Sequence, residues 1–578
     1  MDRRGLVPDC SPLTRRIIYA LILASSVCAL YAQASGFSYL RLDDWGYTAG
    51  CPFVSGGLSL ANICEAFTRF RYGGMWMPLT YISYAADLAI FGASWHAHHA
   101  VNILIHAANA VLAFFFIRML VRRYDAWGDF ACFAFVLFWA VHPQRVEAVA
   151  WIAARKDLLW TGLALAAFIC TLRGRMAGAL LACTGACLSK PSAMCVPALV
   201  LLICWREKRL CGIRKILPWL VPMLIVACFA AITAIRAQSN PEGMMPTPRA
   251  VDDTFYSRLF SAFSSVGLYA ANLVWPREVY FDYMSIANGW WLAIAAAAVV
   301  AALFWRCRSW RGDIAFAALF FFVAIAPVSG IAGNYGDNPR ADRFIYLASL
   351  AASFIFASAL AAIENRTMRR CAAVGALMLS FACAAVAAIV TASYRNDVSA
   401  FTRTLAFEPD HWRALQHLGS EYAGRLGRTD EGVDMLRLSM RISPRDSTAE
   451  LLAYVLACRG EKNDAPEIIR LCRKAAKHPQ LDRRGMMAES LGIVAMWQSR
   501  PHDALKYFKA SIAAPDRFYK SDEAKFRLAD AYREIGENEN ALAILRALAL
   551  SDDKSTRRRA LEAAEKIFFA AEAGDLEL

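Results

Sequence analysis

The sequence predicts an all-α protein, in which a polytopic membrane helix bundle is followed by an α-solenoid of short helical repeats. Of the 578 residues, 58% are hydrophobic and only 19% are charged, whereas soluble domains carry about 25% charged residues. Long apolar runs alternate with short polar breaks up to about Thr391, and amphipathic helices follow from Trp412 onward. The predicted domains are therefore a membrane domain, residues 1–393, and a repeat domain, residues 394–578.

The apolar runs predict about eleven transmembrane helices, because roughly twenty apolar residues are needed to cross the hydrocarbon core. They begin near Ile17, Val101, Phe130, Leu158, Ala177, Ala193, Ile216, Trp290, Ile314, Phe344 and Cys371. The first run is expected to be a membrane helix rather than a signal peptide. The segment from Phe255 to Trp275 is apolar on one side but contains Arg258, which predicts a helix that lies in the interface or re-enters the bilayer.

Basic residues predict the orientation, because short loops rich in Lys and Arg stay in the cytoplasm. Such loops contain Arg15/Arg16, Arg118/Arg122/Arg123, Arg173/Arg175, Arg206/Lys208/Arg214/Lys215 and Arg366/Arg369/Arg370. The N-terminus is therefore expected in the cytoplasm, and an odd number of spans places the repeat domain outside it. The short cytoplasmic loops favour a bacterial inner membrane facing a periplasm. The net charge of +14 then reports topology, and nucleic acid is excluded as a partner.

The C-terminal helices resemble about four tetratricopeptide repeats and a last capping helix from about Thr556. Leu418-Gly419, Leu491-Gly492 and Leu528-Ala529 recur at multiples of roughly 36 residues, close to the known repeat length. The units end at Pro444, Pro479 and Pro515, and small residues for close helix approach stand at Gly432, Ala504 and Ala541. This part is expected to bind an extended peptide or an assembly partner.

Two carboxylates, Asp43 and Asp44, follow directly after the first span. Adjacent carboxylates near a membrane repel each other, so one can be held ionised while the other titrates at higher pH, which suits a general base. The alternative is a solvated loop anchored at the interface by Trp45 and Tyr47.

A second polar segment runs from His142 to Asp157 and contains His142, Glu147, Arg155 and Lys156. Lipid would penalise each charge at the bilayer centre by about 2.5–3.5 kcal/mol, so these side chains are expected to face a cavity, or to be ion-paired in a re-entrant turn.

Further cations, Lys190, Arg340 and Arg343, stand at the predicted outer ends of spans. Together with Arg155 and Lys156 they predict a site for a lipid phosphate. Snorkelling to ordinary head groups explains a single such residue but not a convergent set.

A group of histidines near the third polar break could suggest a metal. His99, Asn102 and His106 share one helical face, but no Cys or carboxylate joins them at ligand spacing. Polar packing between helices is the preferred interpretation. A divalent metal stays an open alternative, although no ligand cluster supports it.

Together, these segments resemble the GT-C superfamily of membrane glycosyltransferases, and specifically the transmembrane-and-TPR-containing O-mannosyltransferase family. The residues that carry the resemblance are Asp43-Asp44, Met77-Pro78-Leu79-Thr80, His99 to His106, His142-Pro143, Glu147-Ala148-Val149-Ala150, Arg155-Lys156-Asp157, Leu188-Ser189-Lys190 and Ala341 to Leu347. The family pattern has Gly where Ala154 stands and an acidic residue where Pro191 stands.

The resemblance implies inverting transfer of a sugar, mannose or another hexose, from a polyprenyl-phosphate donor to an extracytoplasmic acceptor such as Ser or Thr of a protein. No cofactor other than this lipid-linked sugar donor is predicted. Asp43 or Asp44 would be the base, with Asp44 slightly preferred, and Arg155, Lys190 and Arg343 would grip the leaving phosphate. Two alternatives stay open: a ligase that moves a lipid-linked oligosaccharide, and a non-catalytic scaffold for envelope assembly.

Overall fold

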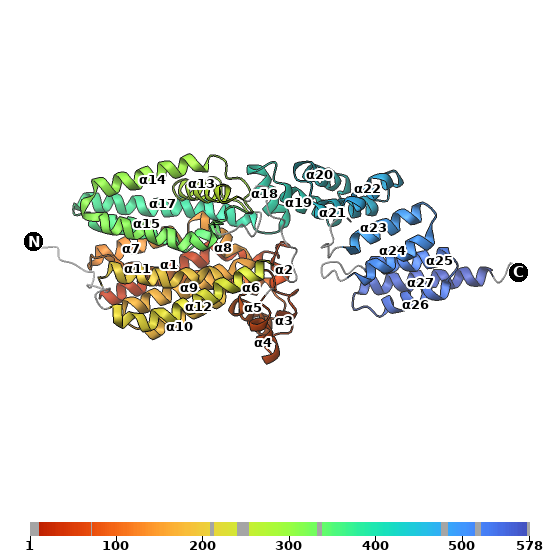
Figure 1. Cartoon of the computed structure of the whole chain (residues 1–578), viewed down its shortest axis with the longest axis horizontal. Helices are drawn as coiled ribbons and strands as arrows, with labels where there is room; N and C mark the ends of the chain where they lie inside the picture. Colours follow the sequence, from red (N-terminus) through yellow and green to blue (C-terminus); the bar gives the residue numbers. More distant parts are fainter. Residues whose placement is uncertain are drawn as a thin grey trace, which may run out of the picture. The chain divides into compact units, whose positions relative to one another are not determined.

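The computed structural model describes residues 11–70, 72–208, 213–239, 254–331, 338–475, 484–514 and 522–574. Within these ranges all regular elements are helices, and an isolated β-bridge joins Tyr283 and Arg340. The chain divides into two compact units, Met1–Phe407 and Glu408–Leu578 (Figure 1). The predicted all-α class, a helix bundle followed by a solenoid, is confirmed for the described residues.

The first unit is that of a membrane protein. Among the described residues, six helical segments are long and apolar enough to cross a bilayer: Pro12–Gly36, Trp95–Leu120, Arg214–Gln238, Gly289–Arg306, Arg308–Val328 and Arg366–Ser393. A seventh arises if Ala126–Ala140 and Pro143–Ala150, which meet at 61°, form one broken span. The predicted number of about eleven is not confirmed.

Several predicted spans are helices that do not qualify as spans on their own. At these places the structure contains α10 (Met176–Ser189), α11 (Val196–Arg206) and α16 (Leu350–Ala362), which have 14, 11 and 13 residues, and α9 (Arg155–Leu172), which begins with three charged residues. Between α10 and α11 the backbone turns at Lys190, because the residue before a proline, here Pro191, is driven out of the helical region. α13 (Phe255–Val274) is not among the candidate spans, in keeping with the interfacial or re-entrant helix predicted there.

A group of short helices lies at one end of the bundle, and the first of them begins with Asp44. Figure 1 shows α2 (Asp44–Tyr47), α3 (Pro52–Ser55), α4 (Leu60–Thr68) and α5 (Pro78–Phe91) grouped beside the ends of α6 (Trp95–Leu120) and α9. Two buried hydroxyls of α5 fix this group, since Tyr84 donates to the carbonyl of Ile152 at 2.6 Å and Thr80 to that of Ser189 at 2.8 Å.

The first unit continues past the change of composition at Tyr394. Helix α18 (Asp397–Phe407) follows α17 (Arg366–Ser393) and packs on the segment before α14 (Gly289–Arg306). Arg403 Nε donates to the carbonyl of Val279 at 2.8 Å, and Thr404 Oγ1 to that of Phe281. These buried contacts explain why the compact membrane unit ends at Phe407.

The second unit consists of helix pairs. Its elements are α19 (Trp412–Gly424), α20 (Thr429–Ile442), α21 (Asp446–Arg459), α22 (Ala465–Ala475), α23 (Arg484–Trp497), α24 (Pro501–Ala513), α25 (Asp522–Glu534), α26 (Asn538–Ala549) and α27 (Lys554–Gly574). A Cβ on Gly419 would lie 2.9 Å from the carbonyl oxygen of Gly432, so α19 and α20 meet backbone to backbone. Pro479 and Pro515 lie outside the described residues.

Candidate functional site

The two carboxylates after the first span occupy different environments. Asp43 is the N-cap of α2 and is half-buried, whereas Asp44 begins the helix and is fully buried. The Asp44 carboxylate accepts the backbone N–H of Leu40 at 2.9 Å and that of Ala153 at 2.8 Å. Burial, opposed by these two hydrogen bonds, raises the pKa of Asp44 to about 8. Asp44 therefore holds the loop in place, while Asp43 is the more accessible of the two.

Lys156 connects this loop with the second polar segment. Its ammonium donates to the carbonyl of Ala153 at 2.8 Å and lies 4.5 Å from the ring centre of Tyr47. Because the N–H of Ala153 binds Asp44, one residue positions both the acidic loop and this cation. Asp43 and Lys156 interact electrostatically across the junction.

Glu147 and Arg343 form the second contact in this region. Both carboxylate oxygens of Glu147 are occupied by Arg343, one by the backbone N–H at 2.9 Å and the other by Nη1. The Arg343 guanidinium lies 5.0 Å from the ring centre of Trp151 and 4.9 Å from that of Phe344. Burial alone would lower the pKa of Arg343, but the carboxylates of Glu147, Asp157 and Asp43 raise it. Arg343 is thus a permanent cation.

Lys190 completes the set of cations. Its ammonium binds Asp157 Oδ1 at 2.5 Å and stands 5.5 Å from the ring centre of Phe344, which it shares with Arg343. Burial lowers the pKa of Lys190, and the Asp157 carboxylate opposes that change. The backbone of Lys190 is extended because Pro191 follows it, so α10 ends there and the Lys190 side chain leaves the chain outside the helix.

These residues form one group, which we call the acid–base cluster. It consists of Asp43, Asp44, Glu147, Lys156, Asp157, Lys190 and Arg343. Among the described residues, Arg343 Nε and Nη2 make no hydrogen bond to protein, and Lys156 and Lys190 each have donors to spare. The cluster can therefore accept an anion without breaking its own ion pairs.

Arg155 is placed elsewhere by the structure. It is fully buried and pairs with Asp87 Oδ2 at 2.6 Å, and its other donors bind the Asn102 side chain and the carbonyls of Ser83 and His98. None of these partners belongs to the acid–base cluster. Asp87 also binds His98 Nδ1 at 2.8 Å, so it holds two basic side chains of the helix bundle together.

Arg340 also lies in separate surroundings. It is buried over the Tyr283 ring, 3.9 Å from its centre, and Nε donates to the carbonyl of Ser285 at 3.3 Å. Tyr283 in turn donates to Asp342 at 2.6 Å. Burial and the nearby Glu147 raise the pKa of Asp342 to about 7.

The histidines serve in packing between helices. His106 binds the Tyr346 hydroxyl at 2.5 Å and the carbonyl of Ala140 at 3.0 Å, and His142 binds the carbonyl of Leu273 at 3.2 Å. His99 is buried with its ring edge against Phe37. Within the described residues, no group of three or more His, Cys, Asp or Glu is arranged to hold a metal ion.

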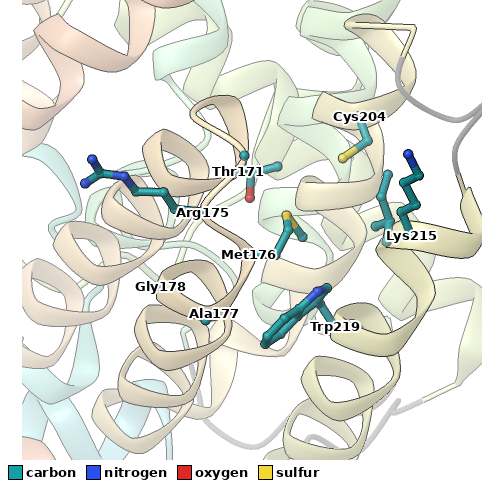
Figure 2. A pocket seen from close by; sticks show the side chains of 10 residues that line it. Thr171, Arg175, Met176, Ala177, Gly178, Cys204, Lys215 and Trp219 are labelled. Atoms are coloured by element: carbon teal, nitrogen blue, oxygen red, sulfur yellow. The ribbon is translucent and has the colours of Figure 1, made fainter.

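Two aromatic residues that lie beside the acid–base cluster, Trp151 and Phe344, were not foreseen as site residues. Nothing in their spacing links them, but both neighbour a candidate residue in the chain, and aromatic rings beside basic residues were a usable signal. A cavity of about 720 Å³ lies elsewhere, lined by Thr171, Arg175, Met176, Lys215 and Trp219 among others (Figure 2). None of its lining residues belongs to the acid–base cluster.

Known proteins resemble this chain at low identity. It is 25% identical over 353 residues to "Protein O-mannosyl-transferase F38B6.6" of Caenorhabditis elegans, which covers 57% of this chain and 49% of that protein. It is also 27% identical over 192 residues to "Protein O-mannosyl-transferase TMTC1" of Mus musculus, and 28% over 159 residues to that of Homo sapiens. At the level of the family, the chain resembles the protein O-mannosyltransferases.

The similarity is partial in length. The chain spans about half of the Caenorhabditis elegans protein, and the matched regions cover 19% and 17% of the mouse and human proteins. Of this chain, the two mammalian matches cover 32% and 26%. No family model matches the sequence. The resemblance drawn from the motifs is confirmed as one to the transmembrane-and-TPR O-mannosyltransferases.

Proposed function

We propose that the chain is a membrane glycosyltransferase that moves a hexose, in the first instance mannose, from a polyprenyl phosphate to a Ser or Thr hydroxyl of a protein outside the cytoplasm. The observation that carries the proposal is the acid–base cluster itself. It places three cations with unused donors next to an accessible carboxylate, at the ends of apolar helices. Relatives named as protein O-mannosyltransferases support the same reaction class.

Asp43 is our candidate for the general base. The half-buried Asp43 can meet an acceptor, whereas the Asp44 carboxylate is enclosed and held by two backbone N–H groups. The acceptor oxygen would attack the anomeric carbon as its proton passes to Asp43, and the bond from that carbon to the phosphate oxygen would break. This reverses the slight preference for Asp44 from the sequence and gives Asp44 a positioning role.

Lys156, Lys190 and Arg343 are our candidates for the phosphate. Charge grows on the phosphate oxygens as the sugar leaves, and preorganised cations stabilise that charge more than the ground state. Arg343 offers two neighbouring donors, Nε and Nη2, in the planar geometry that suits phosphate. Glu147 and Asp157 would hold Arg343 and Lys190 ready. We assign Arg155 and Arg340 to structural support.

The helical repeats would present the acceptor. Paired helices of this kind form extended surfaces that suit peptides, and we expect the second unit to bind the protein substrate on the same side of the membrane as the cluster. The N-terminus would then lie in the cytoplasm.

The test is transfer by the purified full-length chain in detergent, supplied with radiolabelled mannosyl polyprenyl phosphate and a Ser/Thr-rich peptide. We expect label on the peptide, a loss of roughly 10²–10⁴-fold in rate for Asp43→Asn, and a smaller loss for Asp44→Asn. Asp125→Asn, which changes a half-exposed carboxylate paired with Arg123, serves as the control.

Three results would contradict the proposal. Full activity of Asp43→Asn would exclude this carboxylate as the base. Transfer from a pyrophosphate-linked oligosaccharide, with none from the monosaccharide phosphate, would make the chain a glycan ligase. Absence of any transfer, with a phenotype that depends on the repeats alone, would favour a scaffold.

A further inference from the structure

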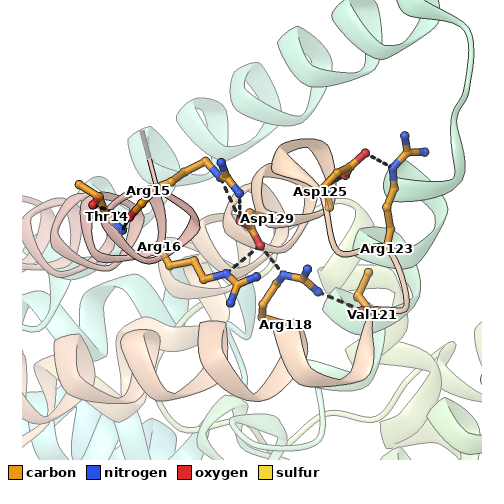
Figure 3. Close-up of polar contacts among 10 residues, drawn as sticks. Thr14, Arg15, Arg16, Arg118, Val121, Arg123, Asp125 and Asp129 are labelled. Carbon is orange, nitrogen blue, oxygen red and sulfur yellow. Dashed lines mark hydrogen bonds and ion pairs between the residues drawn. The ribbon is translucent and has the colours of Figure 1, made fainter. Parts of the chain in front are cut away.

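Three arginines converge on one buried carboxylate at the other end of the first span. Asp129, fully buried in the first turn of α7 (Ala126–Ala140), accepts Arg15 Nε at 2.9 Å and Nη2 at 2.6 Å, and Arg16 Nε at 3.0 Å. Arg118 Nε binds the same carboxylate. Figure 3 shows the three guanidinium groups turned toward Asp129, those of Arg15 and Arg16 from α1 and that of Arg118 from the last turn of α6.

The charges in this arrangement do not balance. Three guanidinium groups face a single carboxylate, which leaves two positive charges in excess, and like charges at this distance repel each other. The neighbouring acid, Asp125, is occupied by Arg123 at 2.8 Å. A second anion would offset this excess of positive charge.

Unused donors remain on these side chains. Arg118 is 4% exposed, yet its Nη2 is buried and makes no hydrogen bond, while Nη1 donates to the carbonyl of Val121 at 3.0 Å. A buried donor left without a partner costs free energy. Among the described residues, Arg15 Nη1 and both terminal nitrogens of Arg16 also have no partner, and the two side chains are 21% and 30% exposed.

The position of the cluster indicates the source of the anion. Arg15 and Arg16 begin the apolar segment Pro12–Gly36, Arg118 ends Trp95–Leu120, and Asp129 begins the next apolar helix. Charges at the ends of spans lie at the depth of lipid head groups. Leu13 and Ile17, which flank the arginines on α1 (Pro12–Tyr31), are 67% and 47% exposed and offer an apolar surface to acyl chains.

We propose that Arg15, Arg16 and Arg118 form a site for the phosphate of an anionic phospholipid, held in the leaflet at which α1 begins. The phosphate oxygens accept hydrogen bonds from the donors of Arg15 and Arg16 that have no protein partner. The buried guanidinium of Arg118 adds positive charge to the site. Asp129 keeps the three guanidinium groups together when the lipid is absent. The site is independent of the proposed transfer reaction.

The test is a titration of the full-length chain in neutral detergent with phosphatidylglycerol, phosphatidylcholine or inorganic phosphate, read by native mass spectrometry. We expect saturable binding of phosphatidylglycerol in preference to phosphatidylcholine. Arg16→Gln should weaken it about fivefold, the effect of removing one basic residue near an anionic surface. This variant leaves Asp129 with Arg15 and Arg118 and should fold.

The control is Arg123→Gln, which removes a positive charge from the same end and breaks the pair with Asp125 and the hydrogen bond to the carbonyl of Ala361, but no contact with Asp129. It should bind phosphatidylglycerol as the natural chain does. If Arg16→Gln bound phosphatidylglycerol as tightly as the natural chain, or if both variants lost the same amount of affinity, the proposed site would be overturned. Inorganic phosphate that displaces the lipid at millimolar concentration would show a soluble anion as the ligand and overturn the lipid proposal.

Discussion

Asp87→Asn tests whether Arg155 supports the fold or binds substrate. Asp87 is 5% exposed, and its carboxylate lies 2.6 Å from Arg155 Nη1, which is fully buried. Removing one partner of a buried ion pair costs about 3–5 kcal/mol, because the other charge stays uncompensated. Arg155 keeps three neutral acceptors, on Asn102, Ser83 and His98, so we expect the lower end of that range, about 3 kcal/mol.

The assay is thermal unfolding of the full-length chain in detergent, followed by donor KM on the variant that remains folded. Asp125→Asn is the matched control, because its pair with Arg123 is half-exposed and should contribute at most about 1 kcal/mol. We expect Asp87→Asn to lower the melting temperature clearly and to leave the donor KM unchanged. An unaltered melting temperature together with a changed KM would refute the structural role and return Arg155 to the phosphate site.

Three further predictions follow from the described geometry. Burial raises the pKa of Asp44 from the usual 3.8 to about 8, so the folded chain keeps a proton that the unfolded chain releases. The stability of the fold should therefore decrease as the pH rises from about 4 to 8. In thermal unfolding, Asp44→Asn should flatten this pH profile. Arg343→Lys should raise the donor KM and lower kcat, because an ammonium cannot supply two neighbouring donors to phosphate; unchanged kinetics would contradict this role. Gly419→Ala should destabilise the repeats by about 1–3 kcal/mol, since its Cβ would meet the carbonyl oxygen of Gly432 at 2.9 Å. If calorimetry gave the variant the same stability as the natural chain, α19 and α20 would be able to separate without cost.

Much of the candidate site was predictable, because its residues stand in polar breaks on one predicted side of the membrane. Asp43, Asp44, Glu147, Lys156, Lys190 and Arg343 were all chosen from the sequence, and the structure brings them together. Charges within apolar surroundings must find partners, so the polar breaks between apolar runs were the signal in the sequence.

The remainder depended on contacts between distant parts of the chain. Arg155 was assigned to the phosphate because the sequence does not reveal its ion pair. The partner, Asp87, lies on α5, far away in the chain. Arg340 is similarly held by Tyr283 from another segment. The predicted number of spans is not confirmed, because an apolar run does not disclose where its helix breaks, as happens before Pro191.

Ala153 binds Asp44 through its amide and Lys156 through its carbonyl, so a single small residue couples two loops that are far apart in the chain. Any insertion or deletion beside Ala153 would displace both the loop that carries Asp43 and the ammonium group of Lys156. Changes in donor or acceptor preference are therefore expected to arise by substitution around this junction. Variation in loop length is expected only in parts of the two loops that do not contact Ala153.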